Sequence, residues 1–310
     1  MNAIAGLHHV TAICGAPQTN LDFYVRALGQ RLVKRTVNFD DPGTYHFYYG
    51  DHEGTPGTIL TFFPFANAGA GRPGPGMACA VAYEVSPAGF DAAAARLAAH
   101  HAPGAAVGER FGQRVLSLVD PDGLTVEIVE TGGAGGAGDV PHFFHSVTLC
   151  LAAPEPTARL LTDVFGYRAA GEATEADGAT RLRFVSGAED AEHGAVVDLE
   201  VPATRRSGLS GAGTIHHVAF RARTDAEQVE WQQRIAAAGF DVTPVIDRQY
   251  FNAVYFREPG GVLFEIATDP PGFATDEPVE TLGEALKLPA QYEPHRARIE
   301  AVLPPVTVPA

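Results

Sequence analysis

The sequence predicts an α+β fold assembled from four copies of a βαβββ unit. Three observations predict it. Similar stretches recur with a period of about 65 to 70 residues. Each stretch begins with a short β-like run and continues into a helix-like segment. Each then ends in strand-like segments, the last of which follows a turn rich in proline or glycine.

The first strand and the helix of each unit are the clearest elements. The expected first strands span residues 7–13, 78–85, 144–151 and 215–221. The expected helices span residues 20–28, 89–100, 157–165 and 225–238. Ser86 followed by Pro87 is a typical helix start, and Thr224 with Glu227 forms a capping-box pattern. Gly29, Gly166 and Gly239 are expected to end three of the helices.

A glycine-rich stretch divides the repeats into two pairs. We take residues 131–141 as a flexible linker between an N-terminal domain, 1–130, and a C-terminal domain, 142–269. The four units within these domains cover residues 6–65, 77–130, 143–202 and 213–269. The tail, 270–310, departs from the repeat, is rich in proline, and contains one expected helix at 294–302.

Composition narrows the classes of partner. The chain of 310 residues carries 22 basic and 37 acidic residues and a formal charge of −15, which argues against nucleic acid. No leader and no apolar run of about 18 residues stands out, so we expect no membrane span and a cytoplasmic location. Cys14, Cys79 and Cys150 lack metal-site spacing and are expected to be small buried residues. A small molecule is the expected partner.

A repeated phrase predicts a metal site. Leu7–Val10 and Ile215–Val218 share the pattern apolar-His-His-Val, which makes His9 and His217 equivalent. Together with Glu265 on a last strand they supply two imidazoles and one carboxylate. Such a facial triad binds Fe(II) and leaves coordination positions open. This site requires units 1 and 4 to pair.

The other pairing of the units would give a poorer site. If units 3 and 4 paired, the cluster would hold Ser146, Asp198, His217 and Glu265, with one imidazole, which suits iron poorly. Counting six residues beyond the turn proline, Phe62 stands where a fourth ligand would lie in unit 1. We therefore prefer the pairing of units 1 and 4, and expect one metal per chain.

A second cluster is expected between units 2 and 3. Glu127 and Asp198 fill the last-strand positions there, and His145 is level with His8 and His216 rather than with the ligands. We interpret this cluster as hydrogen-bonded acidic groups and not as a second metal site.

Four longer motifs carry a family resemblance: Gly6–Thr11, Gly29–Asn38, Gly54–Thr58 and Asp247–Phe251. With the four βαβββ units, the chain resembles the vicinal oxygen chelate superfamily, which includes glyoxalase I, extradiol dioxygenases and bleomycin-resistance proteins. The motifs look most like its hydroquinone-type ring-cleaving dioxygenases. The resemblance implies two curved-sheet, open-barrel domains and a metal site formed by units 1 and 4. It also implies an extradiol-type, hydroquinone 1,2-dioxygenase that uses Fe(II), or alternatively Mn(II), with O2 and a small aromatic substrate.

The resemblance also implies roles for five residues beside the ligands: His8, Thr11, His216, Arg248 and Tyr255. His8 or His216 would serve as acid–base, Arg248 would stabilise an oxyanion, and Tyr255 would donate a hydrogen bond to substrate, with Thr11 in contact with it. From the residues alone, Arg248 could equally form a surface salt bridge with Asp247 or Glu258, and Tyr255 could be a core aromatic.

The remaining histidines are not expected to take part. His46, His52, His100 and His101 are predicted to be solvated. Two other functions stay open: a glyoxalase-like metal-dependent isomerase or lyase, which would need a fourth protein ligand, and a metal-free drug-binding resistance protein, which would not need repeated histidines. A homo-oligomeric state is also left open.

Overall fold

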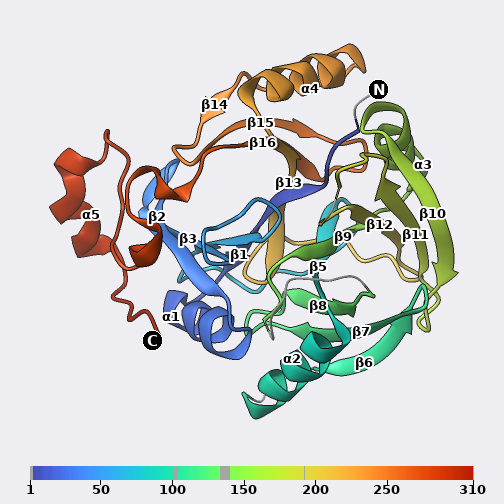
Figure 1. Ribbon diagram of the computed structural model, residues 1–310, viewed down its shortest axis with the longest axis horizontal. Coiled ribbons are helices and arrows are strands. Elements are labelled where there is room, and N and C mark those ends of the chain that lie inside the picture. The colour runs from blue at the N-terminus through green and yellow to red at the C-terminus, as the bar shows by residue number, and fades with distance from the viewer. Residues whose placement is uncertain (1–2, 101–103, 133–139, 192, 310) are drawn as a thin grey trace.

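In the computed structural model, two eight-stranded sheets curl into open half-barrels that lie side by side (Figure 1). The structure describes residues 3–100, 104–132, 140–191 and 193–309; within the predicted linker, 133–139 lie outside the described residues, as does His101. The α+β class and the two curved sheets confirm the expected fold. The described helices include none long and apolar enough to cross a membrane.

The first sheet combines units 1 and 4, in the order β14-β15-β16-β13-β1-β4-β3-β2. Its strands from unit 1 are β1 (Leu7–Cys14), β2 (Arg31–Asn38), β3 (Asp41–Gly50) and β4 (Ile59–Pro64). Its strands from unit 4 are β13 (Thr214–Ala222), β14 (Ile246–Asp247), β15 (Phe251–Arg257) and β16 (Leu263–Pro271). The two units join where β1 pairs antiparallel with β13.

The second sheet combines units 2 and 3, in the order β10-β11-β12-β9-β5-β8-β7-β6. Its strands from unit 2 are β5 (Met77–Val85), β6 (Ala106–Arg110), β7 (Gln113–Val119) and β8 (Thr125–Glu130). Its strands from unit 3 are β9 (Phe144–Cys150), β10 (Tyr167–Thr174), β11 (Thr180–Ser186) and β12 (Val196–Val201). Here the two units join by antiparallel pairing of β5 with β9.

The predicted division of the chain at 131–141 therefore does not coincide with the division into sheets. Each sheet takes one unit from each side of the linker: units 1 and 4 form the first sheet, and units 2 and 3 form the second. The physical reason is that sheet continuity depends on which first strands exchange backbone hydrogen bonds, and the first strand of unit 1 finds its partner in unit 4. Linker position carries no information about that choice.

The unit helices lie on the outside of the sheets (Figure 1). In units 2 and 4 they are regular: α2 (Pro87–Ala99) and α4 (Asp225–Ala237). In units 1 and 3 a short α-helix, α1 (Pro17–Leu21) or α3 (Glu155–Arg159), continues into a π-helical turn, Asp22–Ala27 or Leu160–Val164. A hydrogen bond from the amide five residues later closes each wide turn. Sequence periodicity did not predict this widening.

The predicted helix caps form, with one difference. The amide of Gly89 donates to Ser86 Oγ at 3.2 Å, and the amide of Glu227 donates to Thr224 Oγ1 at 3.1 Å. The Glu227 side chain does not return to the Thr224 amide, as a standard capping box would require; it accepts from the Arg223 amide at 2.7 Å. The Glu227 side chain therefore holds the backbone at Arg223, one residue before the N-cap residue Thr224.

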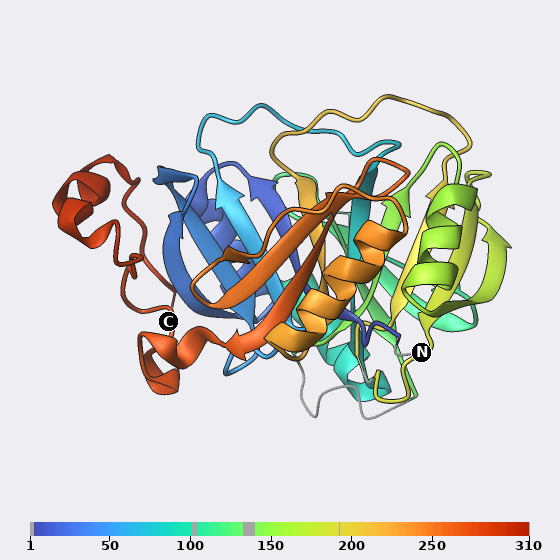
Figure 2. The same ribbon diagram turned by 90° about the horizontal axis from the view of Figure 1, so that it is seen from above.

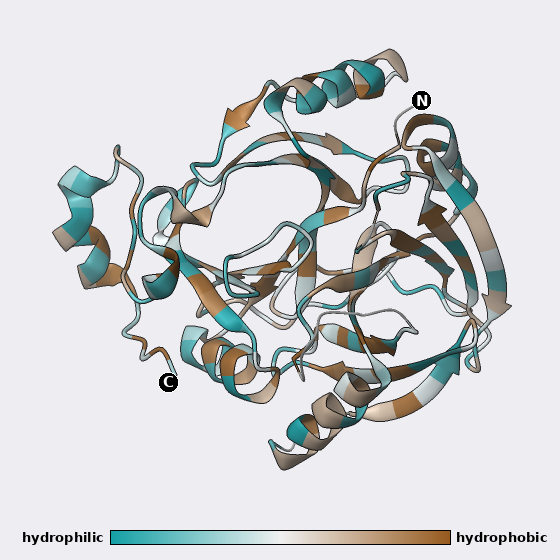
Figure 3. Ribbon diagram, viewed as in Figure 1, coloured by the Kyte–Doolittle hydropathy of each residue, from teal (hydrophilic) through white to brown (hydrophobic). Residues whose placement is uncertain are grey.

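Helix α4 holds the outer strands of unit 4 in place. Figure 3 shows α4 as mostly hydrophilic, and its buried residues are Gln228, Trp231 and Ile235. The Gln228 amide donates 2.7 Å hydrogen bonds to the carbonyls of Asn252 on β15 and Ile266 on β16. The Ile266 carbonyl belongs to the residue after Glu265, so α4 anchors the strand that carries the predicted carboxylate ligand.

The tail covers the edge of the first sheet at β2 (Figure 2). It contains three 3-10 turns, Phe273–Thr275, Val279–Thr281 and Glu293–His295, and the helix α5 (Arg296–Val302), so the helix predicted at 294–302 is confirmed. Lys34 of β2 is fully buried beneath it and donates to the Phe273 carbonyl at 3.0 Å, to Asp276 at 2.6 Å and to Glu277.

The three cysteines are unpaired, as expected. Cys14 and Cys150 are buried and Cys79 is partly buried.

Candidate metal centre

Two β-bulges bring consecutive histidines onto one side of the first sheet. In the β1–β13 ladder, Leu7 pairs with Phe220 and His9 with Ala219, which leaves His8 as the extra residue. Farther along, Thr11 pairs with His217 and Ala12 with Ile215, which leaves His216 as the extra residue. Neighbouring side chains on a regular strand point to opposite faces. Because each bulge breaks this alternation, His8 touches His9 and His216 touches His217.

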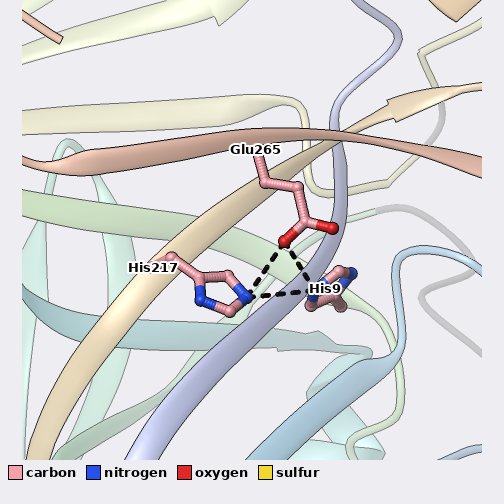
Figure 4. Close-up of side chains that lie close together, drawn as sticks. All are labelled: His9, His217 and Glu265. Carbon is pink, nitrogen blue, oxygen red and sulfur yellow. Dashed lines mark hydrogen bonds and ion pairs between the residues drawn. The ribbon is translucent and has the colours of Figure 1, made fainter. Parts of the chain in front are cut away.

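His9, His217 and Glu265 converge as predicted (Figure 4). Glu265 Oε2 lies 3.3 Å from His9 Nε2 and 3.0 Å from His217 Nε2, and the two Nε2 atoms are 3.3 Å apart. The three side chains come from β1, β13 and β16 and are buried. Among the described residues, this is the one group of histidine, cysteine and acidic side chains close enough to share a metal ion.

The hydrogen bonds of His8 fix the tautomer of His9. His8 Nε2 lies 3.1 Å from the Thr268 carbonyl, which can only accept, so His8 Nε2 carries a hydrogen. Because neutral His8 then has a lone pair at Nδ1, it accepts from His9 Nδ1, 2.9 Å away. His9 therefore directs a lone pair from Nε2 towards Glu265. Hydrogen-bonded support of this kind is typical of metal-bound histidines.

Glu265 supplies the strongest test of whether a metal fits. The carboxylate is fully buried, yet neither oxygen accepts a hydrogen bond of normal geometry from the described residues. Burial opposes ionisation of this carboxyl, and in the metal-free centre its pKa falls below the usual range only through hydrogen bonds and positive charge from His9 and His217. Burial likewise lowers the pKa of His217 and keeps it neutral. A buried anion facing imidazole lone pairs is costly without a cation, so the residues fit a divalent metal.

The position equivalent to Glu265 in unit 1 is Thr61, and the prediction of Phe62 was wrong by one residue. In unit 4, Glu265 lies beside Ala219, which pairs with the ligand His9. In unit 1, Thr61 lies beside Thr11, which pairs with the ligand His217. Thr61 and Glu265 therefore occupy equivalent positions. Phe62 instead packs in the core against Tyr24. Counting from the turn proline failed because the loop before β4 differs by one residue from the loop before β16. No carboxylate stands at the fourth ligand position.

A cavity of about 390 Å³ opens onto the triad. Its walls are largely aromatic, with Phe39, Tyr48, Phe63, Phe65 and Phe251 among the lining residues. Of the predicted site residues, those that line it are His9, His216, His217, Arg248 and Tyr255. His8 lies behind the centre and lines a separate cavity of about 300 Å³, and Thr11 is fully buried beside His217. The structure thus divides the predicted residues into a cavity group and a supporting group.

Arg248 and Tyr255 form a pair on one wall of this cavity. Arg248 Nε donates to the Tyr255 hydroxyl at 3.2 Å, and its Nη1 lies 3.3 Å from the exposed carboxylate of Asp40. Neither Asp247 nor Glu258, the partners considered from the sequence, pairs with it among the described contacts; Glu258 accepts from Thr157 and from the Val262 amide. Burial raises the pKa of Tyr255, so the hydroxyl stays protonated.

His46 is a cavity residue that the sequence analysis missed. It was predicted to be solvated, yet it is buried, lines the cavity and bonds to Tyr48 and Thr61. Burial, together with the nearby His217 and His9, lowers its pKa and keeps it neutral. Alternation on β3 was the signal: Tyr45, Phe47 and Tyr49 face the core, so His46 and Tyr48 share the other side of the strand. Which side faces the metal was decided only by the sheet.

The second sheet fills the corresponding place with arginines. Arg183 binds Asp198 through two hydrogen bonds of 2.9 and 2.8 Å, and Arg110 binds Glu127 at 2.7 and 3.0 Å. His145 sits at the bulge of β9 and contacts Ser146 Oγ at 3.0 Å. The interpretation of this cluster as hydrogen-bonded acidic groups is confirmed: guanidinium groups neutralise the carboxylates.

Comparison with known proteins agrees with this fold. The family model described as the Glyoxalase/Bleomycin resistance protein/Dioxygenase superfamily matches residues 6–128 and 143–266. The chain belongs to this superfamily. A crystal structure titled "putative dioxygenase from Bacillus subtilis" is similar across the whole molecule, with a TM-score of 0.91 and 47% identity over 100% of this chain and 99% of that one. The family resemblance seen in the sequence motifs is confirmed.

Two curated relatives carry more specific names. The chain is 47% identical to "Putative ring-cleaving dioxygenase MhqO" of Bacillus subtilis, over 98% of this chain and 97% of the relative. It is 34% identical to "Chlorohydroquinone/hydroquinone 1,2-dioxygenase" of Sphingobium indicum, over 94% of this chain and 93% of the relative. Both relatives therefore match this chain over nearly their whole length.

Proposed function

We propose that this protein is a non-haem Fe(II)-dependent dioxygenase that cleaves the ring of a hydroquinone or catechol. One observation carries the proposal: three side chains that could hold a metal ion, with Thr61 at the fourth position, face an aromatic-lined cavity of about 390 Å³. A cavity of this volume accommodates a single substituted aromatic ring. The names of the relatives support the same reaction class.

His9, His217 and Glu265 would hold Fe(II), which would supply the redox chemistry between a phenolic substrate and O2. The protein orients the ring. Flat aromatic walls restrict it to a narrow range of tilts, and Phe251, whose ring centroid lies 4.8 Å from that of His9, limits approach from one side.

Arg248 and Tyr255 are suited to hold an anionic oxygen of the substrate. The guanidinium is permanently cationic and lies against the Tyr255 hydroxyl at 3.2 Å, so the two present donors from one wall. Donors placed in advance on the wall of an aromatic-lined cavity stabilise developing negative charge more than bulk water would. We assign Arg248 to oxyanion stabilisation and Tyr255 to a substrate hydrogen bond.

His216 is the better placed of the two candidates for proton transfer. Its Nδ1 lies 2.8 Å from His217 Nδ1, whose hydrogen it accepts when His217 Nε2 is a ligand. Nε2 of His216 then carries a hydrogen and lies on a residue that lines the cavity. We therefore assign His216 as proton donor and His8, with both nitrogens engaged behind the centre, as a positioning residue.

Mn(II) would suit the same ligands, since first-row metals share sites of this type. The glyoxalase-like isomerase is disfavoured by the threonine at the fourth ligand position, and a metal-free resistance protein leaves the unbonded Glu265 carboxylate unexplained. The cytoplasmic location and a homo-oligomeric state stay predictions.

The test is O2 consumption by protein reconstituted anaerobically with Fe(II) and offered hydroquinone, methylhydroquinone or catechol. We expect uptake matched by loss of aromatic absorbance, and no uptake by His217→Ala. Ser146→Ala changes the equivalent position of the second sheet and should retain full activity. Metal-loaded protein that consumes no O2 with any of these substrates would contradict the proposal.

A further inference from the structure

A chain of hydrogen bonds runs from the cavity wall to the fourth ligand position. The Tyr48 hydroxyl lies 2.9 Å from His46 Nδ1, His46 Nε2 lies 2.8 Å from Thr61 Oγ1, and Thr61 Oγ1 lies 2.9 Å from Thr11 Oγ1. All four side chains are buried, and Tyr48 and His46 line the cavity. Neither the metal ligands nor the roles assigned above account for His46, Tyr48 or Thr61.

The hydrogen bonds in this series all run in one direction, from Tyr48 towards Thr11. We take the Tyr48 hydroxyl as the donor to His46 Nδ1, because a phenol is a better hydrogen donor than acceptor. A neutral imidazole that accepts at Nδ1 carries its hydrogen on Nε2, so His46 donates to Thr61. Thr61 then donates to Thr11, which leaves the Thr11 hydroxyl hydrogen to point elsewhere.

The free end of the chain lies on the metal side of β1. Thr11 pairs directly with the ligand His217 across the antiparallel ladder, and directly opposed residues present their side chains on the same face. Thr61, in register with Thr11, occupies the place that Glu265 holds beside His9. By this register the paired hydroxyls lie on the side of the centre that has no protein ligand, beneath the residues that line the cavity.

We propose that Tyr48, His46 and Thr61 are positioning residues that turn the Thr11 hydroxyl hydrogen towards this corner, where it donates to an anionic oxygen of a bound small molecule. The proposal deepens the proposed function and rests on its metal centre. If these hydrogen bonds ran the other way, the Thr11 hydroxyl would donate to Thr61 and present a lone pair to the ligand oxygen. The direction set at Tyr48 therefore decides whether Thr11 attracts or repels the ligand.

The first test uses Zn(II)-loaded protein, which performs no redox chemistry, and 4-nitrophenol, whose absorbance distinguishes phenol from phenolate. Thr61→Val should raise the apparent pKa of the bound phenol by about half a unit, which is about a threefold loss of phenolate affinity relative to neutral phenol. Thr61→Ser keeps a hydroxyl and should restore the wild-type value.

The matched control is Thr36→Val. Thr36 is a fully buried threonine of β2, its hydroxyl has no partner among the described residues, and the chemical change is identical. It should leave the bound phenol unchanged. Equal shifts for Thr61→Val and Thr36→Val, or a Thr61→Ser variant that behaves like the valine variant, would overturn the proposal.

A second test needs no metal and no ligand. In metal-free protein, two-bond nitrogen–proton correlation spectra should show His46 with its hydrogen on Nε2 in the wild type. Tyr48→Phe removes the donor at the head of the chain and should allow the other tautomer to be populated. A His46 that carries its hydrogen on Nδ1 in the wild type contradicts the proposed direction.

These readouts separate the inference from the proposed reaction. Absence of O2 consumption with correct tautomers and phenolate shifts would remove the dioxygenase function and keep the hydrogen-bond chain. An active dioxygenase in which Thr61→Val does not shift the pKa of the bound phenol would keep the proposed function and remove the proposed role of the hydrogen-bond chain.

Discussion

His8 Nδ1 lies 2.9 Å from His9 Nδ1, although the two residues are neighbours on one strand. The contact exists because the β1 bulge places both rings on the same side. It gives the ligand His9 a hydrogen-bond partner that holds its ring and its tautomer. The partner is in turn held by the Thr268 carbonyl on β16, the strand that also carries Glu265.

Loss of this contact should weaken metal binding. His8→Leu is expected to raise the metal dissociation constant by about 10- to 100-fold, because a supporting hydrogen bond to a ligand is removed. Titration against a competing chelator measures it. His8→Asn, which returns an acceptor close to the place of Nδ1, should recover part of the affinity, and exposed His100→Leu should change nothing. A change below about threefold in His8→Leu would contradict the prediction.

The metal-free protein should lose stability below neutral pH. Burial, followed by the charge of Arg183, lowers the pKa of His145 to about 4, against 6.5 in the unfolded chain, and the residue is only 6% exposed. The unfolded state therefore binds this proton first, so its contribution is complete above pH 6.5 and is lost as pH falls towards 4. The loss is about 3 kcal/mol for this one group.

Urea unfolding in EDTA at intervals from pH 8 to 4.5 measures this dependence. His145→Gln should flatten the fall in the free energy of unfolding below pH 6.5, while His8, His46 and His217, whose pKa values burial also lowers, keep part of it. Identical pH profiles for wild type and His145→Gln would show that His145 titrates normally in the folded state.

The arginines of the second sheet should support folding and not metal binding. Arg183→Met leaves the buried Asp198 carboxylate with Arg181, at 3.6 Å, as its ion-pair partner among the described residues, and should cost about 3 kcal/mol of unfolding free energy. Bound metal should stay at one ion per chain, whereas Glu265→Ala should lose it. Arg168→Met, at an exposed arginine of β10, serves as the control. Elemental analysis that finds a second ion, lost in Asp198→Ala, would restore the second cluster as a metal site.

Lys34 should fasten the tail to the first sheet. Lys34→Met removes the buried cation that Asp276 and Glu277 share and should destabilise the protein by about 3 kcal/mol. Within the described part of the chain, the two carboxylates then keep only hydrogen bonds from uncharged donors. The tail should also become accessible to proteases before the sheets do. Lys287→Met, at the other lysine of the chain, is the comparison. Equal resistance of the tail in both variants would show that other contacts hold it.

Much of the site could be predicted because the sequence duplicates it. The repeated His-His-Val phrase and a carboxylate on a last strand indicated His9, His217 and Glu265, and the chemistry of the donors favoured pairing units 1 and 4 before any strand pairing was known. The first strands and helices followed from periodicity and caps, with boundaries that differ from the structure by a few residues.

Other features depended on contacts between strands far apart in the sequence. The bulges at His8 and His216, the assignment of the fourth position to Thr61 and the inward face of His46 all follow from the register between β1, β13, β3 and β4. Arg183 and Arg110 neutralise Asp198 and Glu127 from neighbouring strands, which turned an apparent second site into an ion-pair cluster. The sequence by itself determined which metal-binding and hydrogen-bonding side chains the protein contains. Only the tertiary structure decided which of them meet, because a shift of one residue in register moves a side chain to the opposite face of a sheet.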